Sequence, residues 1–159
     1  MGKDDQTIIP YLTIPENFCD FINGTMFQGM QILDPQKIRP IPQRNTATVK
    51  GDDGTPVILD GIRDVVMKHD FRGIYAIFAT EAQGKMHYAM PVRAMSYDAA
   101  EYLNQVKALA RRHRNAKDLK TPVEFLSGLS ADDKLVPVYT IILYYGCLLY
   151  TSAVSLSSE

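Results

Sequence analysis

The sequence predicts a single α/β domain, because stretches with helical and with strand-like patterns alternate along its 159 residues. A chain of this length fits one domain and can bury a hydrophobic core. Its composition, 46% hydrophobic and 22% charged, is typical of a globular protein. Length, composition and alternation together define the class, and a local pattern predicts each element.

Two helices are predicted from apolar side chains that recur at helical spacing. The first covers 15–31, where Gly29 helps to end it. The second covers 91–114, since Pro91 suits a first helical position. The apolar positions are Phe18, Phe21, Ile22, Thr25 and Met26 in the first helix, and Val92, Met95, Ala99, Tyr102, Val106 and Leu109 in the second.

Three segments are rich in β-branched and apolar residues and predict strands. VILDGIRDVVMKH and GIYAIFATEAQ lie close together, and a hairpin with Phe71 and Arg72 as its two-residue loop joins them most simply. VPVYTIILYY is short and almost continuously apolar, which predicts a buried strand. The polar segment 33–56 predicts an extended loop with a short strand around 46–49, and 121–134 predicts a loop or short helix.

Charge, cysteine content and apolar runs limit the possible functions and cellular locations of the protein. The net charge is −1, so any affinity for nucleic acid must come from a local basic patch. Cys19 and Cys147 lack metal-ligand spacing, which suits a reducing compartment. No apolar run reaches the roughly 18 residues that span a bilayer. We therefore expect a cytoplasmic protein without a membrane partner.

Asp64, Glu81 and Gln83 are the candidate catalytic residues. With a Phe71–Arg72 loop, Asp64 lies opposite Ala79. Because strand side chains alternate, Glu81 and Gln83 share the face of Asp64. Asp64 and Glu81 are then diagonal neighbours, roughly 7–8 Å apart. Two such carboxylates can hold one divalent cation; Mg²⁺ suits oxygen ligands, and Mn²⁺ is the alternative.

Such a site predicts phosphodiester hydrolysis. A carboxylate-bound Mg²⁺ polarises the phosphodiester, lowers the pKa of a bound water and offsets developing charge. The amide of Gln83 could orient the attacking water or donate to a phosphate, but it carries no positive charge. By itself, an Asp followed by a distant Glu-x-Gln is a weak signal, because strand ends often carry solvated acids.

The order of several motifs resembles the transposase and recombination-promoting nuclease group of the PD-(D/E)XK family. In that group a strand with Arg-Asp precedes a strand ending in Glu-x-Gln, and a Met-Pro-x-Arg helix start with a nearby Tyr follows. A later strand ends in Tyr-Gly. The matching residues are Arg63-Asp64, Glu81-Ala82-Gln83, Met90-Pro91-Val92-Arg93, Tyr97 and Tyr145-Gly146, while Asp20 and Asn23 resemble the polar pair of the family's first helix.

This resemblance implies a restriction-endonuclease-like core, with a mixed central sheet flanked by helices, and Mg²⁺-dependent cleavage of DNA. Asp64 and Glu81 would be the metal ligands, and Gln83 would take the usual Lys position. Ala82 departs from the more polar residue expected between Glu and Gln. Family members also continue well past the strand that ends near Gly146.

The last residues do not continue the pattern. CLLYTS resembles one reading frame of an adapter used in sequencing libraries. We therefore expect a nuclease-like domain over 1–146 that is incomplete at its C-terminal end, and a non-native or disordered tail over 147–159.

Several residues carry two interpretations. Arg93 could reach a phosphate or steady Glu81, or form a surface ion pair. Tyr97 could form a hydrogen bond near the site or pack in the core. The sequence suggests no partner for His113. The basic cluster could contact a DNA backbone or only complement a helix C-terminus; it consists of Lys107, Arg111, Arg112, Arg114, Lys117 and Lys120.

The leading functional hypothesis is a Mg²⁺-dependent DNA endonuclease linked to mobile elements or recombination. The alternatives are a catalytically inactive DNA-binding module and a fragment without autonomous activity. The sequence leaves the oligomeric state open.

Overall fold

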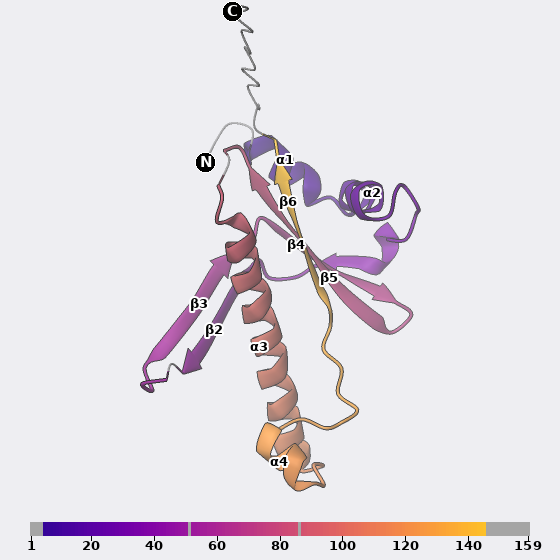
Figure 1. The fold of residues 1–159 in the computed structure, drawn as a ribbon. Coiled ribbons are helices and arrows are strands. Elements are labelled where there is room, and N and C mark those ends of the chain that lie inside the picture. The colour runs from indigo at the N-terminus through magenta and orange to yellow at the C-terminus, as the bar shows by residue number, and fades with distance from the viewer. Residues whose placement is uncertain (1–4, 51, 86, 146–159) are drawn as a thin grey trace, which may run out of the picture.

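The computed structural model describes residues 5–50, 52–85 and 87–145, and the tail predicted for 147–159 lies outside them. The fold is mixed α/β, which confirms the predicted class. A four-stranded mixed sheet has the order β1-β4-β5-β6, and β2 and β3 form a second sheet (Figure 1). The helices are α1 (Asp5–Leu12), α2 (Pro15–Met26), η1 (Pro35–Lys37), α3 (Met90–Ala116) and α4 (Pro122–Ser127). The strands are β1 (Ile38–Pro40), β2 (Arg44–Lys50), β3 (Pro56–Ile62), β4 (Val65–Phe71), β5 (Ile74–Gln83) and β6 (Val138–Tyr144).

Helices cover both faces of the four-stranded sheet (Figure 1). Strand β5 is buried on both sides, and its side chains alternate between two clusters. Ala76 and Phe78 pack with Phe18 and Ile22 of α2. Ile77 and Ala79 belong to the second cluster, on the α3 side of the sheet. Burying side chains such as Phe78 contributes roughly 1.5–3 kcal/mol each, and the two clusters together fix β5 as the central strand.

The turn between β4 and β5 differs from the predicted one by a single residue. Phe71 pairs with Ile74, so the loop is Arg72–Gly73. Both loop residues have positive φ, 57° and 90°, as a type I′ hairpin turn requires. Asp70 Oδ1 also accepts a hydrogen bond of 2.6 Å from Gly73 N. The predicted Phe71–Arg72 loop was wrong because Gly73 supplies the φ that this turn needs.

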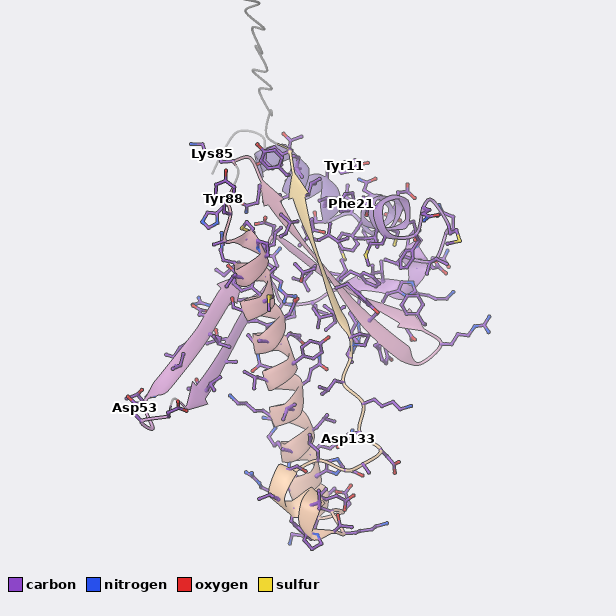
Figure 2. The ribbon with its side chains drawn as sticks, in the orientation of Figure 1. Tyr11, Phe21, Asp53, Lys85, Tyr88 and Asp133 are labelled. Atoms are coloured by element: carbon purple, nitrogen blue, oxygen red, sulfur yellow. The ribbon has the colours of Figure 1, made fainter. Side chains whose placement is uncertain are left out.

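The first of the two segments predicted to form a hairpin is divided into β3 and β4, which belong to separate strand pairs. The residues of β3 pair antiparallel with β2, which forms within the expected loop 33–56 and is longer than the expected strand. A turn at 52–54 precedes β3, and Asp53, labelled in Figure 2, accepts there through Oδ1 from Thr55 N at 3.0 Å. The β2–β3 pair packs on α3 and projects away from the main sheet (Figure 1).

The helical predictions were close. Helix α3 covers the predicted 91–114 with short extensions and ends at Ala116, before the capping residue Lys117, whose φ is 54°. Helix α2 ends at Met26 rather than 31, before a turn with positive φ at Gln28 and Gly29. Within the described ranges, no helix combines the length and apolar character needed to cross a membrane.

Two glycine substitutions should change stability in opposite directions. Gly73→Ala should lower the free energy of unfolding by about 1 kcal/mol, because an L-residue is strained at this φ. Gly24→Ala should raise it by about 0.5–1 kcal/mol, since Gly24 is helical and a Cβ there meets no atom within 4 Å. Urea denaturation of both variants measures the difference, and equal shifts would contradict the assigned turn.

Candidate metal site

Asp64 and Glu81 lie side by side at one end of the β4–β5 pair. Val65 pairs with Thr80, so Asp64, one residue before β4, lies across from Glu81 rather than from Ala79. The two registers differ by two residues, so the predicted common face is retained. The Oδ2 atom of Asp64 accepts a 2.7 Å hydrogen bond from Ala82 N. This bond anchors Asp64 beside the end of β5.

Glu81 is a buried carboxyl group with an incomplete set of partners. The residue is only 2% exposed, and its buried Oε1 atom has no hydrogen-bond partner among the residues that the structure describes. Desolvation first, and repulsion from Asp64 second, raise the pKa of Glu81 to about 7. Arg93 and Arg63 act in the opposite direction. The protein therefore holds a carboxylate that its own groups stabilise only partly.

Arg63 is buried next to this pair and ties three elements together. It is 1% exposed, and its NH2 group donates 2.6 Å to Oδ1 of Asp98 on α3. Thr140 on β6 donates to the same oxygen at 2.7 Å. Within the described part of the chain, the Nε and NH1 groups of Arg63 have no hydrogen-bond partner. Sequence reasoning did not identify Asp98, because its partners lie 35 and 42 residues away along the chain.

The backbone around Asp64 is fixed from the other side by Gln43. The Gln43 amide donates 2.6 Å to the carbonyl of Asp64, and Arg63 N donates 3.1 Å to the carbonyl of Gln43. This reciprocal pair orients the Arg63-Asp64 dipeptide before β4 begins. No feature of the segment around Gln43 indicated this role, because the sequence pattern there predicts only a loop.

Arg93 and Tyr97 are neighbouring residues of α3 that lie next to Asp64 and Glu81, here called the acid pair. Arg93 NH2 donates 3.0 Å to the hydroxyl of Tyr97. This hydrogen bond is the main reason that the pKa of Arg93 is raised, and Glu81 and Asp64 add to it. The Tyr97 ring covers Gly61, where an added Cβ would overlap the ring. Tyr97 therefore packs against Gly61 and also forms a hydrogen bond with Arg93, so both interpretations of Tyr97 apply.

Gln83 continues the face of Glu81 two residues along β5. It pairs with Tyr144 of β6, and its carbonyl accepts 3.1 Å from Tyr145 N. The side chain is half-buried. The structure thus places the three predicted residues on one face, with Asp64 and Glu81 nearest to each other.

The two residues of the polar pair predicted on the first helix differ in their surroundings. Asn23 is buried and accepts from Ile32 N and Leu33 N at 3.1 and 2.8 Å. Asp34, which follows Leu33, donates its backbone N–H to His69 of β4. His69 follows Asp64 by five residues, so the two are roughly 16 Å apart along the extended chain. Asn23 therefore secures the loop after α2. Asp20 is exposed on the same helix.

The basic cluster lies at the far end of α3. Arg111 follows Arg93 by 18 residues, which is roughly 27 Å along the helix. Lys107 donates 3.0 Å to the carbonyl of Thr48, and Arg112 pairs with Asp133 at 2.6 Å. Arg111 and Arg114 are exposed. Some side chains of the cluster therefore form contacts within the fold, and the exposed cations Arg111 and Arg114 are remote from Asp64.

His113 has partners that the sequence did not reveal. It is 5% exposed, with Nδ1 2.6 Å from Asp118 Oδ1 and Nε2 2.8 Å from Asp133 Oδ2. A neutral imidazole can donate from only one nitrogen, so this arrangement favours the charged form. These two carboxylates raise the pKa of His113, although burial opposes them, and Arg112 NH2 lies 3.2 Å from Nε2.

The donor set suits a hard cation with few protein ligands. Within the described residues no group of three or more His, Cys, Asp or Glu side chains gathers as a metal site. Mg²⁺ commonly takes one or two carboxylates and completes its shell with waters or phosphate oxygens. The unpartnered Oε1 of Glu81 beside Asp64 fits that requirement.

Comparison with known proteins identifies no relative. Scans against protein-family models, curated proteins and solved structures each returned no match.

Glu81→Gln should stabilise the metal-free protein at alkaline pH. The folded pKa of Glu81 lies above its ordinary value of 4.5, so stability present at acidic pH is lost as pH rises toward about 7. We expect a loss on the order of 3 kcal/mol that the Gln variant lacks. Melting curves in a chelator, with Glu16→Gln as the exposed control, measure this. Parallel pH profiles for wild type and Glu81→Gln would contradict it.

His113→Gln should remove a stabilisation that depends on protonation. Because the folded pKa of His113 is raised, its contribution is complete below about pH 6.5 and is lost as pH rises through the folded value. Wild-type melting temperature should therefore fall over that range more than that of the variant. His87→Gln, at an exposed position, is the matched control. An equal or larger fall in the His113 variant than in wild type would refute the ion-pair arrangement.

Proposed function

We propose that this protein is a Mg²⁺-dependent DNA endonuclease with a restriction-endonuclease-like core, in which Asp64 and Glu81 are the metal ligands. The observation that carries the proposal is the buried, unpartnered carboxylate oxygen of Glu81 beside Asp64. A buried charge without a partner is costly, and proteins retain such groups mainly where a ligand compensates them. A divalent cation is the ligand whose charge and chemistry suit two carboxylates.

A cation held there would polarise a phosphodiester and stabilise the negative charge that develops on its oxygens. Mn²⁺ takes the same kind of oxygen ligand and should replace Mg²⁺. The backbone N–H of Ala82 and the amide of Gln43 keep Asp64 in position before any ligand arrives. Such preorganisation matters because misplacement of a ligand by about 1 Å is costly to catalysis.

Arg93 and Gln83 supply the neighbouring polar groups. Arg93 is partly exposed, and Tyr97 orients its guanidinium near Glu81. A phosphate oxygen is the natural acceptor for its remaining donors. Gln83 lies on the face of Glu81 and offers an amide that donates to a phosphate or orients a water. The site thus pairs two carboxylates with one cationic and one neutral donor.

The spacing between this site and the basic cluster supports DNA as the substrate. The separation of roughly 27 Å along α3 is less than one turn of B-form DNA, about 34 Å. Arg111 and Arg114 are exposed on the last turns of the helix. A single duplex could therefore contact both regions, with phosphates bound by these arginines.

A non-catalytic DNA-binding module is the second candidate, and one observation favours it. Glu81 is 2% exposed, and the pKa of about 7 leaves a substantial protonated fraction at neutral pH. A carboxyl group that remains protonated does not bind a cation. Metal binding therefore has to compete with a proton, and weak competition would leave a protein that binds DNA without cutting it.

The endonuclease proposal predicts metal-dependent nicking of supercoiled plasmid. Wild-type protein should nick plasmid with Mg²⁺ or Mn²⁺, and cleavage should stop in a chelator. Asp64→Asn and Glu81→Gln should each lower the rate by about a thousandfold or more, because each removes a ligand. Gel analysis of plasmid forms over time provides the measurement.

Glu16→Gln and Asp20→Asn are matched controls, since both carboxylates are exposed on α2. Cleavage that persists in both ligand variants, or in a chelator, would refute the proposal. Binding to plasmid without nicking by folded wild-type protein would instead support the DNA-binding module.

A further inference from the structure

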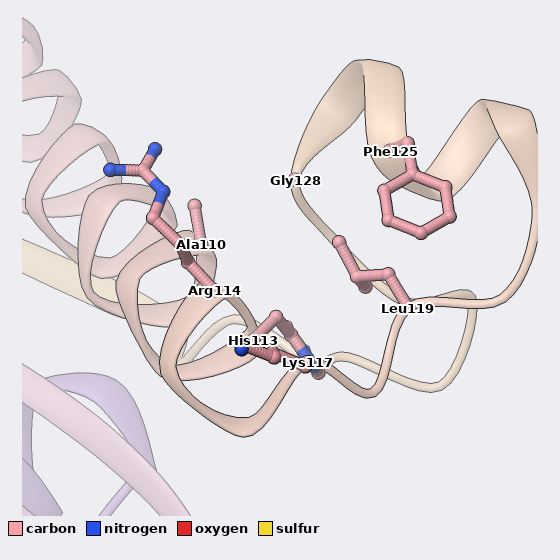
Figure 3. Close-up of a pocket in the computed structure, with 7 residues that line it drawn as sticks. All are labelled: Ala110, His113, Arg114, Lys117, Leu119, Phe125 and Gly128. Carbon is pink, nitrogen blue, oxygen red and sulfur yellow. The ribbon is translucent and has the colours of Figure 1, made fainter.

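A cavity lies where the end of α3 meets α4, far from the acid pair. Its volume is about 420 Å³, within the range typical of small-molecule sites. Figure 3 shows the last turns of α3 on one side and the α4 segment on the other, where the side chains of Leu119 and Phe125 lie next to each other. The lining residues are Ala110, His113, Arg114, Lys117, Leu119, Phe125 and Gly128.

The frame of this cavity is fixed by polar contacts at each bend. Helix α3 ends in a left-handed residue, Lys117, whose N–H donates 2.7 Å to the carbonyl of His113. Thr121 and Glu124 form a reciprocal capping box at the start of α4. Gly128 ends α4 with a φ of 75° and donates 2.7 Å to the carbonyl of Glu124. The walls are therefore set before any ligand binds.

His113 connects this frame to the segment that follows α4. Asp118 and Asp133 contact its two ring nitrogens, and Arg112 pairs with the second oxygen of Asp133. Ser130 N also donates 2.9 Å to Asp133. Asp118 and Asp133 are thus paired with His113 and Arg112. The carboxylate of Glu124 instead accepts from the backbone N–H groups of Lys120 and Thr121.

The lining itself combines apolar walls with positive charge. Ala110, Leu119 and Phe125 supply the apolar surface, and Phe125 is 68% exposed. Arg114 and Lys117 are exposed cations, and the lining residues within the described ranges include no acidic side chain. An apolar interior favours a ligand with an apolar body, and unpaired cations at its edge favour a negative end group.

We propose that this cavity binds a small amphipathic anion, meaning an organic acid with an aromatic or aliphatic body and one carboxylate, sulfonate or phosphate group. The apolar body contacts Leu119 and Phe125, and the anionic group pairs with Arg114 or Lys117. This site is separate from Asp64 and Glu81 and does not depend on nuclease activity. The basic cluster thereby has a second role besides contact with DNA.

The test uses a charged and a neutral dye of similar size. The folded protein is titrated with 8-anilinonaphthalene-1-sulfonate and, separately, with N-phenyl-1-naphthylamine, and fluorescence gives affinity and stoichiometry. We expect one site whose affinity for the sulfonate dye is about five- to tenfold higher, because the two dyes have a similar aromatic body and only the sulfonate dye is charged. Substitution of Arg114 and Lys117 by Gln should abolish that preference, whereas Lys134→Gln, an exposed control, should not.

Ala110→Leu places a larger side chain in the cavity and should weaken sulfonate binding at least about tenfold. Ala99→Leu, at an exposed position of the same helix, is its control. Circular dichroism checks the fold, and Phe125→Ser, which removes an apolar wall, replaces Ala110→Leu if that variant unfolds.

Unchanged sulfonate affinity in the folded variant, or equal affinity for both dyes, would overturn the proposal. Sedimentation showing a wild-type dimer that Phe125→Ser converts to monomer would also overturn it, and would assign this face to contact between copies.

Discussion

The register between β4 and β5 is the constraint on which the candidate site depends. The type I′ turn at Arg72–Gly73 sets Phe71 against Ile74, and each later pair follows from that contact. At the other end of the pair, Asp64 comes to lie across from Glu81. A slip by one residue would move Asp64 to the opposite face of the sheet. Because β5 is buried on both faces, such a slip would also exchange the side chains of its two clusters, which differ in size, and the packing of the core therefore maintains the register.

The electrostatics of the site follow from this geometry. Glu81 is brought next to another carboxylate in a region with little water, so its charged form is disfavoured. Arg63 and Arg93 offset part of that cost, and Asp98 offsets part of the charge of Arg63. Over the residues that the structure describes, Oε1 of Glu81 and two donors of Arg63 still have no hydrogen-bond partner. This imbalance among buried charges is what a bound cation and an anionic substrate would relieve, and it is the physical basis of the proposed endonuclease.

Sequence reasoning succeeded where a pattern is local and failed where a contact is distant. The apolar stripe of 91–114 predicted α3 because helical periodicity is contained within the segment itself. The common face of Asp64 and Glu81 was also predicted, since the incorrect turn shifted the register by two residues and preserved its parity. The pairing of β3 with β2 was missed, because strand segments do not specify their partners. The ion pair of His113 with Asp133 spans 20 residues and left no local signal.

The central claim is that Glu81 is a buried carboxyl group whose charged form requires a cation. A carbon-13 NMR titration of its side-chain carboxyl group, without and with Mg²⁺, tests that claim most directly. The pKa should be about 7 in metal-free solution and should fall by about one unit or more when Mg²⁺ is added, because cation and proton compete for the same carboxylate. A pKa near the ordinary value of 4.5, or one that Mg²⁺ leaves unchanged, would contradict the account.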